Sequence, residues 1–295
     1  MSSRNQLRTR LEQTEIVVIP GVYDCLSAKI AEQLGFEVVA TSGFGIAAST
    51  LGLPDYGFLT ATEMFYSIGR ITQSVNIPLI ADLDTGYGNV LNVIRTVKEA
   101  VNLGVSGILL EDQEWPKKCG HFDGKRVIPT PEQVSKIQAA VEARGDSGLV
   151  IIGRTDARAP LGLEEAINRG LAYFEAGADV IFIEAPQSQD ELVKIAEALP
   201  NIPLVANIIE GGRTPQLSAQ ELQQMGFKIV FFPLTGLFTV TKAMTDCLRH
   251  LKETGTTANL ENLVSFQEFE KLIDVPKYRK IEQQFYNQID KQDSV

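Results

Sequence analysis

Eight short apolar runs recur along the chain, and this recurrence constrains the fold more than any other feature of the sequence. Each run is rich in Val, Ile, Leu or Phe and is almost continuously apolar, which is typical of strands buried on both faces of a parallel sheet. The runs lie at 16–20, 37–41, 78–82, 107–111, 149–154, 180–184, 203–207 and 228–232. Stretches with helical periodicity alternate with them, at 25–34, 90–103, 131–144, 163–176 and 190–199.

This alternation predicts an α/β fold of the (β/α)₈ TIM-barrel type, because eight strands that alternate with helices over about 235 residues match that barrel in number and size. A doubly wound open sheet is the alternative, but no G-x-G-x-x-G motif follows the first run. We expect residues 1–295 to form a single domain with the barrel core at about 15–252. Glycines that would end helices before the next strand follow four helical stretches, at Gly35, Gly104, Gly177 and Gly226.

After the eighth run the pattern becomes helical only. A helix is expected at about 239–252, and further helical segments follow a polar linker, within about 258–291. Such an extension could fold back on its own barrel or pack on a neighbouring subunit, and the pattern of residues leaves both arrangements open.

The composition excludes several classes of function. The chain has 27 Lys and Arg against 37 Asp and Glu, and no segment concentrates the basic residues, so we expect neither nucleic acid nor a membrane surface as a partner. The apolar runs are too short to span a bilayer and the first residues lack a signal peptide, which indicates a cytoplasmic protein. With 3 Cys and 2 His, any metal should be a hard cation held by carboxylates.

Polar and ionisable residues stand where the apolar runs end, which is the position of active-site groups in a barrel. Helix N-caps account for single Ser, Thr, Asp or Asn residues at such places, but not for Glu or Arg. The residues are Ser42, Asp82, Asp84, Glu111, Asp112, Arg154, Asp156, Glu184 and Asn207. Their common position predicts that they converge on one mouth of the barrel.

The segment DLDTGYG after the third run is the most metal-like part of the sequence. Asp82 and Asp84 are two residues apart, so in an extended chain their carboxylates point the same way. Glu111 and Asp112 could supply further oxygens from the adjacent strand, directly or through water. Oxygen ligands with room for water and substrate favour Mg²⁺, with Mn²⁺ as a substitute.

A long loop after the fourth run has the character of a lid. It carries Lys117, Lys118, Cys119 and His121. Two lysines and an imidazole would favour the thiolate of Cys119 and tune it for acid–base or nucleophilic work. The alternative is an inert surface cysteine in a basic loop.

The sequence KKCGH in this loop, together with TSGFGIAAS, GLPDYG, RTDAR and ANIIEGG, resembles the isocitrate lyase and phosphoenolpyruvate mutase superfamily. The resemblance covers residues 15–290, and KKCGH is specific to the carbon–carbon lyase branch, which includes 2-alkylmalate, 2,3-dimethylmalate and 2-methylisocitrate lyases. It implies a Mg²⁺-dependent barrel whose eighth helix is swapped between subunits, in a homotetramer built as a dimer of helix-swapped dimers.

The resemblance also implies roles for individual residues. Cys119 would be the general acid on a loop that closes over the substrate, and the other residues implied for catalysis are Lys117, His121 and Glu111. The residues implied for Mg²⁺ are Asp82, Asp84 and Glu111. Those implied for binding a small carboxylic acid are Ser42, Gly43, Phe44, Asp55, Arg154, Glu184, Asn207 and Phe238.

Two positions depart from the pattern of methylisocitrate and isocitrate lyases. Ala40 stands where those enzymes have a Tyr, which leaves Glu111, Glu184 or a metal-bound water as candidates for the base. Phe238 lies near the position of an Arg that binds the distal carboxylate of a tricarboxylate, so a third carboxylate would stay unpaired. The departure at Phe238 favours a smaller or alkyl-substituted diacid.

The expected reaction is therefore cleavage of a 2-hydroxy diacid of the 2-alkylmalate type into a 2-oxo acid and a carboxylate. Hydrolysis of oxaloacetate is a further candidate activity. The alternatives are 2-methylisocitrate cleavage, chemistry on a P–C bond as in the mutase branch, which typically lacks the KKCGH loop, and a barrel that binds its ligand without catalysis.

Overall fold

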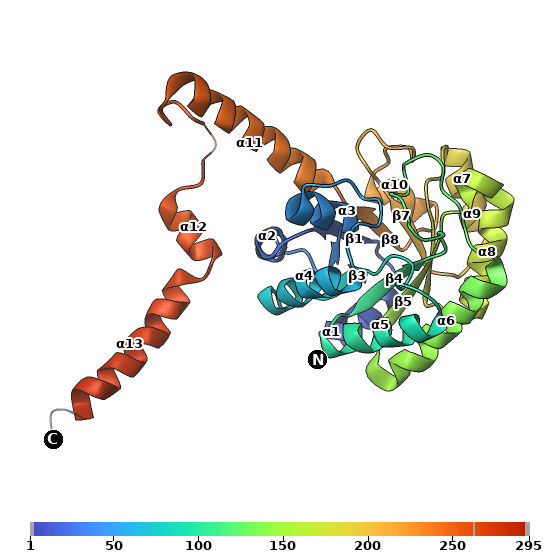
Figure 1. Cartoon of the computed structure of the whole chain (residues 1–295), viewed down its shortest axis with the longest axis horizontal. Coiled ribbons are helices and arrows are strands. Elements are labelled where there is room, and N and C mark those ends of the chain that lie inside the picture. The colour runs from blue at the N-terminus through green and yellow to red at the C-terminus, as the bar shows by residue number, and fades with distance from the viewer. Residues whose placement is uncertain (1–2, 262, 293–295) are drawn as a thin grey trace. The chain divides into compact units, whose positions relative to one another are not determined.

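The computed structural model describes residues 3–261 and 263–292. Within them, eight parallel strands close into a barrel in sequence order, and β1 pairs with β8 to complete it (Figure 1). The predicted (β/α)₈ barrel is confirmed. The strands are β1 (Val17–Val22), β2 (Val39–Thr41), β3 (Leu79–Asp82), β4 (Gly107–Glu111), β5 (Val150–Thr155), β6 (Val180–Ile183), β7 (Leu204–Asn207) and β8 (Ile229–Phe232).

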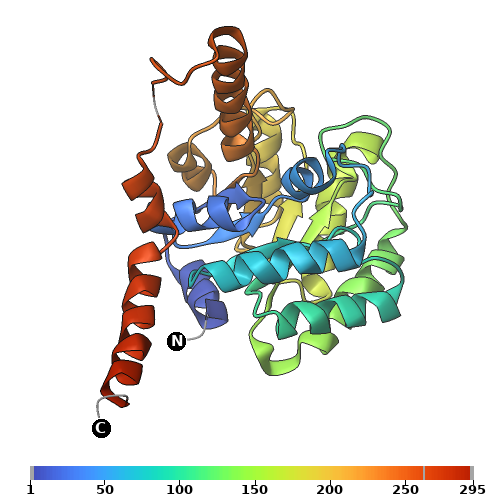
Figure 2. The same cartoon turned by 60° about the vertical axis from the view of Figure 1, so that its left-hand side comes forward.

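Helices surround the barrel, as the turned view in Figure 2 also shows, where α4 in cyan and α5 in teal lie side by side on its outside. A short π-helix, Ala47–Leu51, continues α3, and a 3₁₀ turn, Gly145–Ser147, follows α6. The helices of this layer are α2 (Cys25–Gln33), α3 (Gly43–Ile46), α4 (Ala61–Ser74), α5 (Val90–Asn102), α6 (Thr130–Arg144), α7 (Arg158–Leu161), α8 (Leu163–Glu175), α9 (Gln189–Ala198) and α10 (Ala219–Gln224).

The apolar side chains form two layers, because each strand is covered on both faces. One cluster fills the inside of the barrel, with Ile80, Ile152 and Phe231 among its members, and the larger cluster packs the strands against the helices. This double burial is the reason that the strands read as continuous apolar runs in the sequence. The four glycines predicted to end helices all have positive φ, at Gly35, Gly104, Gly177 and Gly226.

The N-terminal helix α1 (Ser3–Glu12) is an element that the sequence analysis did not assign. Its sequence is polar apart from Leu7, which is fully buried and belongs to the cluster inside the barrel, and Leu11, which is partly buried against that cluster. Arg4 Nε donates to the carbonyl oxygen of Val105, just before β4, at a distance of 2.8 Å. Arg8 Nε donates to the carbonyl oxygen of Gly148, just before β5, at the same distance. The helix therefore covers the end of the barrel where the strands begin, which leaves the opposite end for a ligand.

The chain divides into two compact units, Met1–Phe238 and Thr239–Val295, and the boundary lies inside α11 (Thr235–Thr254). Beyond α11, the second unit contains α12 (Phe266–Leu272) and α13 (Val275–Gln292). The expected helices at 239–252 and within 258–291 are thus present, while the prediction of one domain stays a prediction. No helix in the described part of the chain is both long and apolar enough to cross a membrane.

Candidate active site

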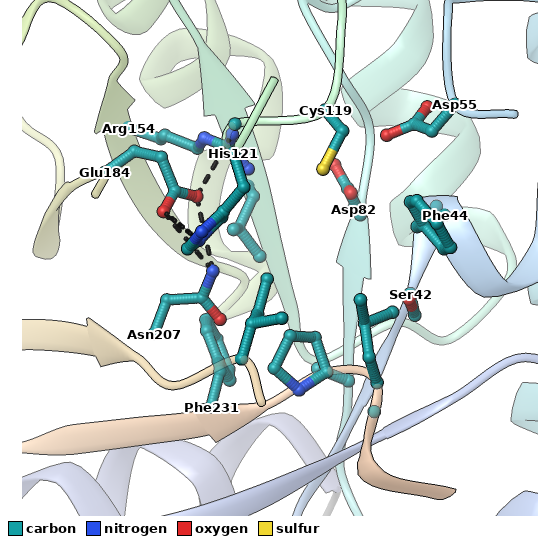
Figure 3. A pocket seen from close by; sticks show the side chains of 18 of the residues that line it. Ser42, Phe44, Asp55, Asp82, Cys119, His121, Arg154, Glu184, Asn207 and Phe231 are labelled. Atoms are coloured by element: carbon teal, nitrogen blue, oxygen red, sulfur yellow. Dashed lines mark hydrogen bonds and ion pairs between the residues drawn. The ribbon is translucent and has the colours of Figure 1, made fainter. Parts of the chain in front are cut away.

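A pocket opens at the carboxyl ends of the strands, where the sequence predicted a site. Its empty volume is about 650 Å³ including space open to solvent, which suits a small molecule. Figure 3 shows Cys119 with Asp55 and Asp82 on one side and His121, Glu184 and Asn207 on the other. The predicted site residues that line it are Ser42, Gly43, Phe44, Asp55, Asp82, Lys117, Cys119, His121, Arg154, Glu184 and Asn207.

Five predicted residues do not line the pocket. Two of them, Asp112 and Asp156, are fully buried behind it. Asp84 and Glu111 are buried below its surface, each 2% exposed. Phe238 lies on α11 and is 40% exposed. The apolar residues that follow β8 in the pocket wall are Pro233 and Leu234 instead.

Lys117 is the central cation on one side of the pocket. Its Nζ lies 2.8 Å from Asp55 Oδ1 and 2.7 Å from Asp84 Oδ1, and all three side chains are nearly inaccessible to solvent. Burial alone would lower the pKa of Lys117, but Asp84, Asp55 and Glu111 outweigh it and hold this pKa well above its ordinary value. Burial raises the pKa of Asp84 to about 6, and Lys117 limits that rise.

The geometry of Asp82 and Asp84 corrects one sequence-based expectation. Asp84 has a φ of 50°, in the left-handed region, because β3 ends at Asp82 and the chain turns there. The two carboxylates therefore do not point the same way, as they would in an extended strand. Asp82 faces the pocket, its Oδ1 accepts the backbone N–H of Asp84 at 3.2 Å, and Asp84 binds Lys117.

The donor set around Asp82 fits a hard cation held partly through water. In the described residues no cluster of three or more His, Cys, Asp or Glu side chains is close enough to bind a metal by itself. However, Glu111 Oε1 is buried and has no hydrogen-bond partner among the residues that the structure describes. Burial raises the pKa of Glu111 well above its usual range, against the attraction of Arg154. Mg²⁺ is usually bound by one or two carboxylates and several water molecules. The Asp82 carboxylate in the pocket and the unpartnered Glu111 oxygen behind it fit this kind of site.

Arg154 is the central cation on the other side. Its Nε lies 2.9 Å from Asp156 Oδ2 and 3.3 Å from Glu111 Oε2, and its Nη2 lies 3.2 Å from Glu184 Oε2. The guanidinium also stands over the Phe182 ring at 5.2 Å. Although burial alone would lower it, these carboxylates hold the pKa of Arg154 well above its ordinary value.

Glu184 is anchored from three directions. Besides Arg154, it accepts hydrogen bonds from Asn207 Nδ2 at 3.3–3.4 Å, and His121 Nε2 lies 3.3 Å from its Oε1. Burial works in the opposite direction, but the Arg154 guanidinium holds the pKa of Glu184 well below its usual range. Glu184 is therefore a fixed, ionised carboxylate in the wall of the pocket.

His121 has one tautomer that satisfies its neighbours. The backbone N–H of Arg213 donates to His121 Nδ1 at 3.0 Å, so Nδ1 is an acceptor and carries no proton. The proton is then on Nε2, which faces Glu184. Arg213 comes from the loop after β7, 92 residues away, and nothing in the sequence pattern indicated this contact.

Cys119 lies on the loop at residues 112–129, and its backbone N–H donates to the Asp55 carbonyl at 3.0 Å. Burial raises the pKa of its thiol to about 11, and the nearby Asp55 and Glu184 act in the same direction. The prediction that the neighbouring lysines favour a thiolate is therefore wrong. Lys117 points to Asp55 and Asp84, and Lys118 donates to the carbonyls of its own loop, so neither stabilises the sulfur anion.

The first residues of the short helix α3 add backbone hydrogen-bond donors to the pocket. Ser42 caps α3, and its Oγ accepts the N–H of Gly45 at 3.1 Å. The N–H groups of Gly43 and Phe44 begin the helix, so they have no acceptor within it, and both residues line the pocket. An added Cβ on Gly43 would lie 2.9 Å from Asp82 Oδ2, which leaves room only for glycine there.

Comparisons with known proteins agree with this arrangement. The profile of a family described as phosphoenolpyruvate phosphomutase matches residues 7–252. The chain is 44% identical to a 2,3-dimethylmalate lyase of Eubacterium barkeri over 97% of its own length and 99% of that protein. It superposes on an oxaloacetate acetylhydrolase in complex with 3,3-difluorooxalacetate with a TM-score of 0.91 and 36% identity, over 96% of each chain. It also superposes on a phosphonopyruvate hydrolase in complex with oxalate and Mg²⁺ with a TM-score of 0.88 and 31% identity, over 97% of this chain and all of the other.

Proposed function

Since the chain belongs to the phosphoenolpyruvate phosphomutase family, we propose that this member of the family is a carbon–carbon lyase that cleaves a 2-hydroxy diacid of the 2-alkylmalate type. The products are a 2-oxo acid and a carboxylate. The observation that carries this proposal is Cys119, a thiol that keeps its proton beside a pocket containing Arg154 and Asp82. A protonated acid facing a bound carboxylic acid is what the protonation of a departing carbanion requires.

In this proposal, Arg154 and the backbone N–H groups of Gly43 and Phe44 bind the substrate carboxylate next to C2. The residues that would hold Mg²⁺ are Asp82, with Glu111 and Asp84 behind it, and the ion would supply positive charge to the developing C2 oxygen anion.

Of the two carboxylates considered as the base that removes the C2 hydroxyl proton, Glu184 lines the pocket and Glu111 does not, so we assign this role to Glu184. A metal-bound water is the alternative base. In the ligand-free site, the Arg154 guanidinium holds the pKa of Glu184 below its usual range, against the effect of burial. A substrate carboxylate on Arg154 shares that charge and adds a negative one, so the basicity of Glu184 rises when the substrate binds.

Cleavage then moves the electron pair of the C2–C3 bond onto C3 and its carboxylate, while C2 becomes the carbonyl of the 2-oxo acid. The Cys119 thiol gives its proton to C3 and is left as a thiolate, which takes up a proton before the next turnover. The closed loop excludes water that would otherwise protonate C3 without stereochemical control.

The substrate class follows from the charges available in the pocket. Among its described lining residues, the permanent cations are Lys117 and Arg154, and both already have carboxylate partners. A third substrate carboxylate would face apolar side chains, which disfavours 2-methylisocitrate. The apolar wall suits an alkyl substituent and consists of Ala40, Ile209, Phe231, Pro233 and Leu234.

Oxaloacetate hydrolysis is a second candidate activity. The resemblance to oxaloacetate acetylhydrolase extends over 96% of the chain, and oxaloacetate needs the same cations as a malate. A Mg²⁺-supplemented screen of C2- and C3-alkylated malates, oxaloacetate, 2-methylisocitrate and phosphonopyruvate, with product masses as the readout, tests the proposal. We expect an alkylated malate to be cleaved fastest. Fastest turnover of 2-methylisocitrate or of phosphonopyruvate would contradict the assignment.

We also propose that the protein works as a homotetramer. The helix α11 carries a regularly spaced series of exposed apolar side chains, Val240, Met244, Leu248 and Leu251, which suits packing against another copy of the chain. Light scattering coupled to size exclusion should give four times the chain mass of 32.4 kDa, and a monomer would contradict this part of the proposal.

A further inference from the structure

Lys125 is a buried cation that the proposed reaction does not use. Its side chain is 1% exposed, and the residue does not line the pocket. It lies at the end of the loop that carries Cys119. A lysine is seldom buried to this degree without a partner that requires its charge.

The ammonium group of Lys125 joins two parts of the site. It lies 3.2 Å from Asp156 Oδ1 and donates a hydrogen bond to the Gly120 carbonyl oxygen. Gly120 directly follows Cys119, so the second contact fixes the backbone beside the thiol. The first contact reaches Asp156, which directly follows strand β5 and lies outside the loop.

Asp156 is the residue that orients Arg154. It accepts from Arg154 Nε at 2.9 Å and from Arg154 Nη2 at 3.2 Å, and it is fully buried. Its own backbone N–H donates to Asp112 Oδ1 at 2.9 Å. Three further donors hold the other oxygen of Asp112, namely Thr155 Oγ1, Tyr173 Oη and Arg169 Nη1. Asp156 is therefore held in a fixed position by residues outside the loop, and Lys125 is its partner from the loop.

The charges around Arg154 explain why a second cation is useful. Three carboxyl groups face the guanidinium, those of Asp156, Glu184 and Glu111. Each of them competes with a substrate carboxylate for the same positive charge. Lys125 offsets the charge of Asp156, so more of the Arg154 field remains for the substrate.

We propose that Lys125 is a positioning residue, which couples closure of the Cys119 loop to the orientation of Arg154 through Asp156. When the loop is closed, Lys125 holds Gly120 and hence the thiol over the pocket. The kinetic part of this inference rests on the proposed lyase function, whereas the part concerning the loop does not.

The substitution Lys125→Met tests the inference, because methionine keeps most of the side-chain volume and removes the charge. Arg126→Met is the matched control, since Arg126 is the next residue and its side chain is 76% exposed in a pair with Glu114. The first readout is the rate at which iodoacetamide modifies Cys119 in the ligand-free protein, located by peptide mass spectrometry. We expect this rate to rise about tenfold in Lys125→Met and to stay unchanged in Arg126→Met.

The second readout is the steady-state kinetics on the substrate found in the screen. Lys125→Met should raise KM and lower kcat, because it weakens both the Arg154 field and the closed loop, and each effect should be about tenfold. If Lys125→Met does not fold, Lys125→Gln replaces it, which keeps a donor for the Gly120 carbonyl without the charge, and we then expect the KM effect to dominate.

The outcomes separate this inference from the proposed function. Faster modification of Cys119 without turnover of any tested acid would support the role of Lys125 in the loop while contradicting the lyase. A lower melting temperature with unchanged modification rate and unchanged KM would show that Lys125 is only structural, and this result would overturn the inference.

Discussion

The protonation state of Cys119 depends on where the neighbouring charges point. Its sequence neighbours Lys117 and Lys118 suggested a thiolate, but the ammonium group of Lys117 is paired with Asp55 and Asp84. Burial of the sulfur raises the pKa of Cys119, and the nearby carboxylates of Asp55 and Glu184 add to this rise, so the thiol is favoured. A protonated sulfur suits an acid better than a nucleophile.

The raised pKa of Cys119 predicts how its reactivity depends on pH. Only the thiolate reacts with iodoacetamide, so with a pKa of about 11 the modification rate should keep rising tenfold per pH unit between pH 7 and 10. Peptide mass spectrometry separates Cys119 from Cys25 and Cys247. A rate that levels off below pH 9 would mean that the thiolate is already formed there, and the assignment as general acid would lose its basis.

At the scale of elements, the loop at 112–129 covers the end of the barrel where the pocket opens, and the helix α1 covers the opposite end. The loop folds back on itself through the Glu114 N–H to Arg126 carbonyl bond and the bridge between Gln113 and Val127. Because its tip packs on Arg154 and Glu184, the loop admits no larger residue at Gly120. An added Cβ on Gly120 would lie 2.5 Å from Arg154 Nη2 and 2.6 Å from Glu184 Cγ.

Gly120→Ala should therefore prevent closure without unfolding the barrel. We expect kcat to fall about a hundredfold, since a displacement of the acid by about 1 Å has an effect of that size. Arg126→Ala serves as the control, because Arg126 lies on the same loop and its side chain is 76% exposed. Steady-state assays on the best substrate check the difference, and equal turnover of the two variants would exclude a closed loop as the active form.

The contribution of α1 depends on one side chain. Leu7→Ala should reduce the free energy of unfolding by about 2–5 kcal/mol, because Leu7 is fully buried among the residues inside the barrel. The exposed residue Gln6 on the same helix gives the control, and Gln6→Ala should change stability by less than about 0.5 kcal/mol. Denaturant titrations at one fixed protein concentration make the comparison. A loss below about 1 kcal/mol for Leu7→Ala would mean that the site can collapse around the missing atoms.

For the whole molecule, the sequence predicted the barrel because burial on both faces leaves continuous apolar runs, and no predicted run differs from its strand by more than two residues at either end. It also predicted which residues end the strands, and parallel strands bring those ends together. It did not predict α1, where two leucines, Leu7 and Leu11, are the only apolar residues of a polar segment. Nor could it predict the partners of Lys125 and Arg213, which depend on how loops meet. The direction of Asp84 was missed because the chain turns after β3.

In the proposed reaction, Cys119 supplies the proton that completes carbon–carbon cleavage. The most direct test compares Cys119→Ser with Cys25→Ser, a control on α2 outside the pocket, on the alkylated malate that the wild-type protein cleaves best. Cys119→Ser should lose about 10²–10⁴-fold in kcat while binding oxalate with Mg²⁺ within a few-fold of the wild type, and Cys25→Ser should retain full activity. Full turnover by Cys119→Ser would contradict the account.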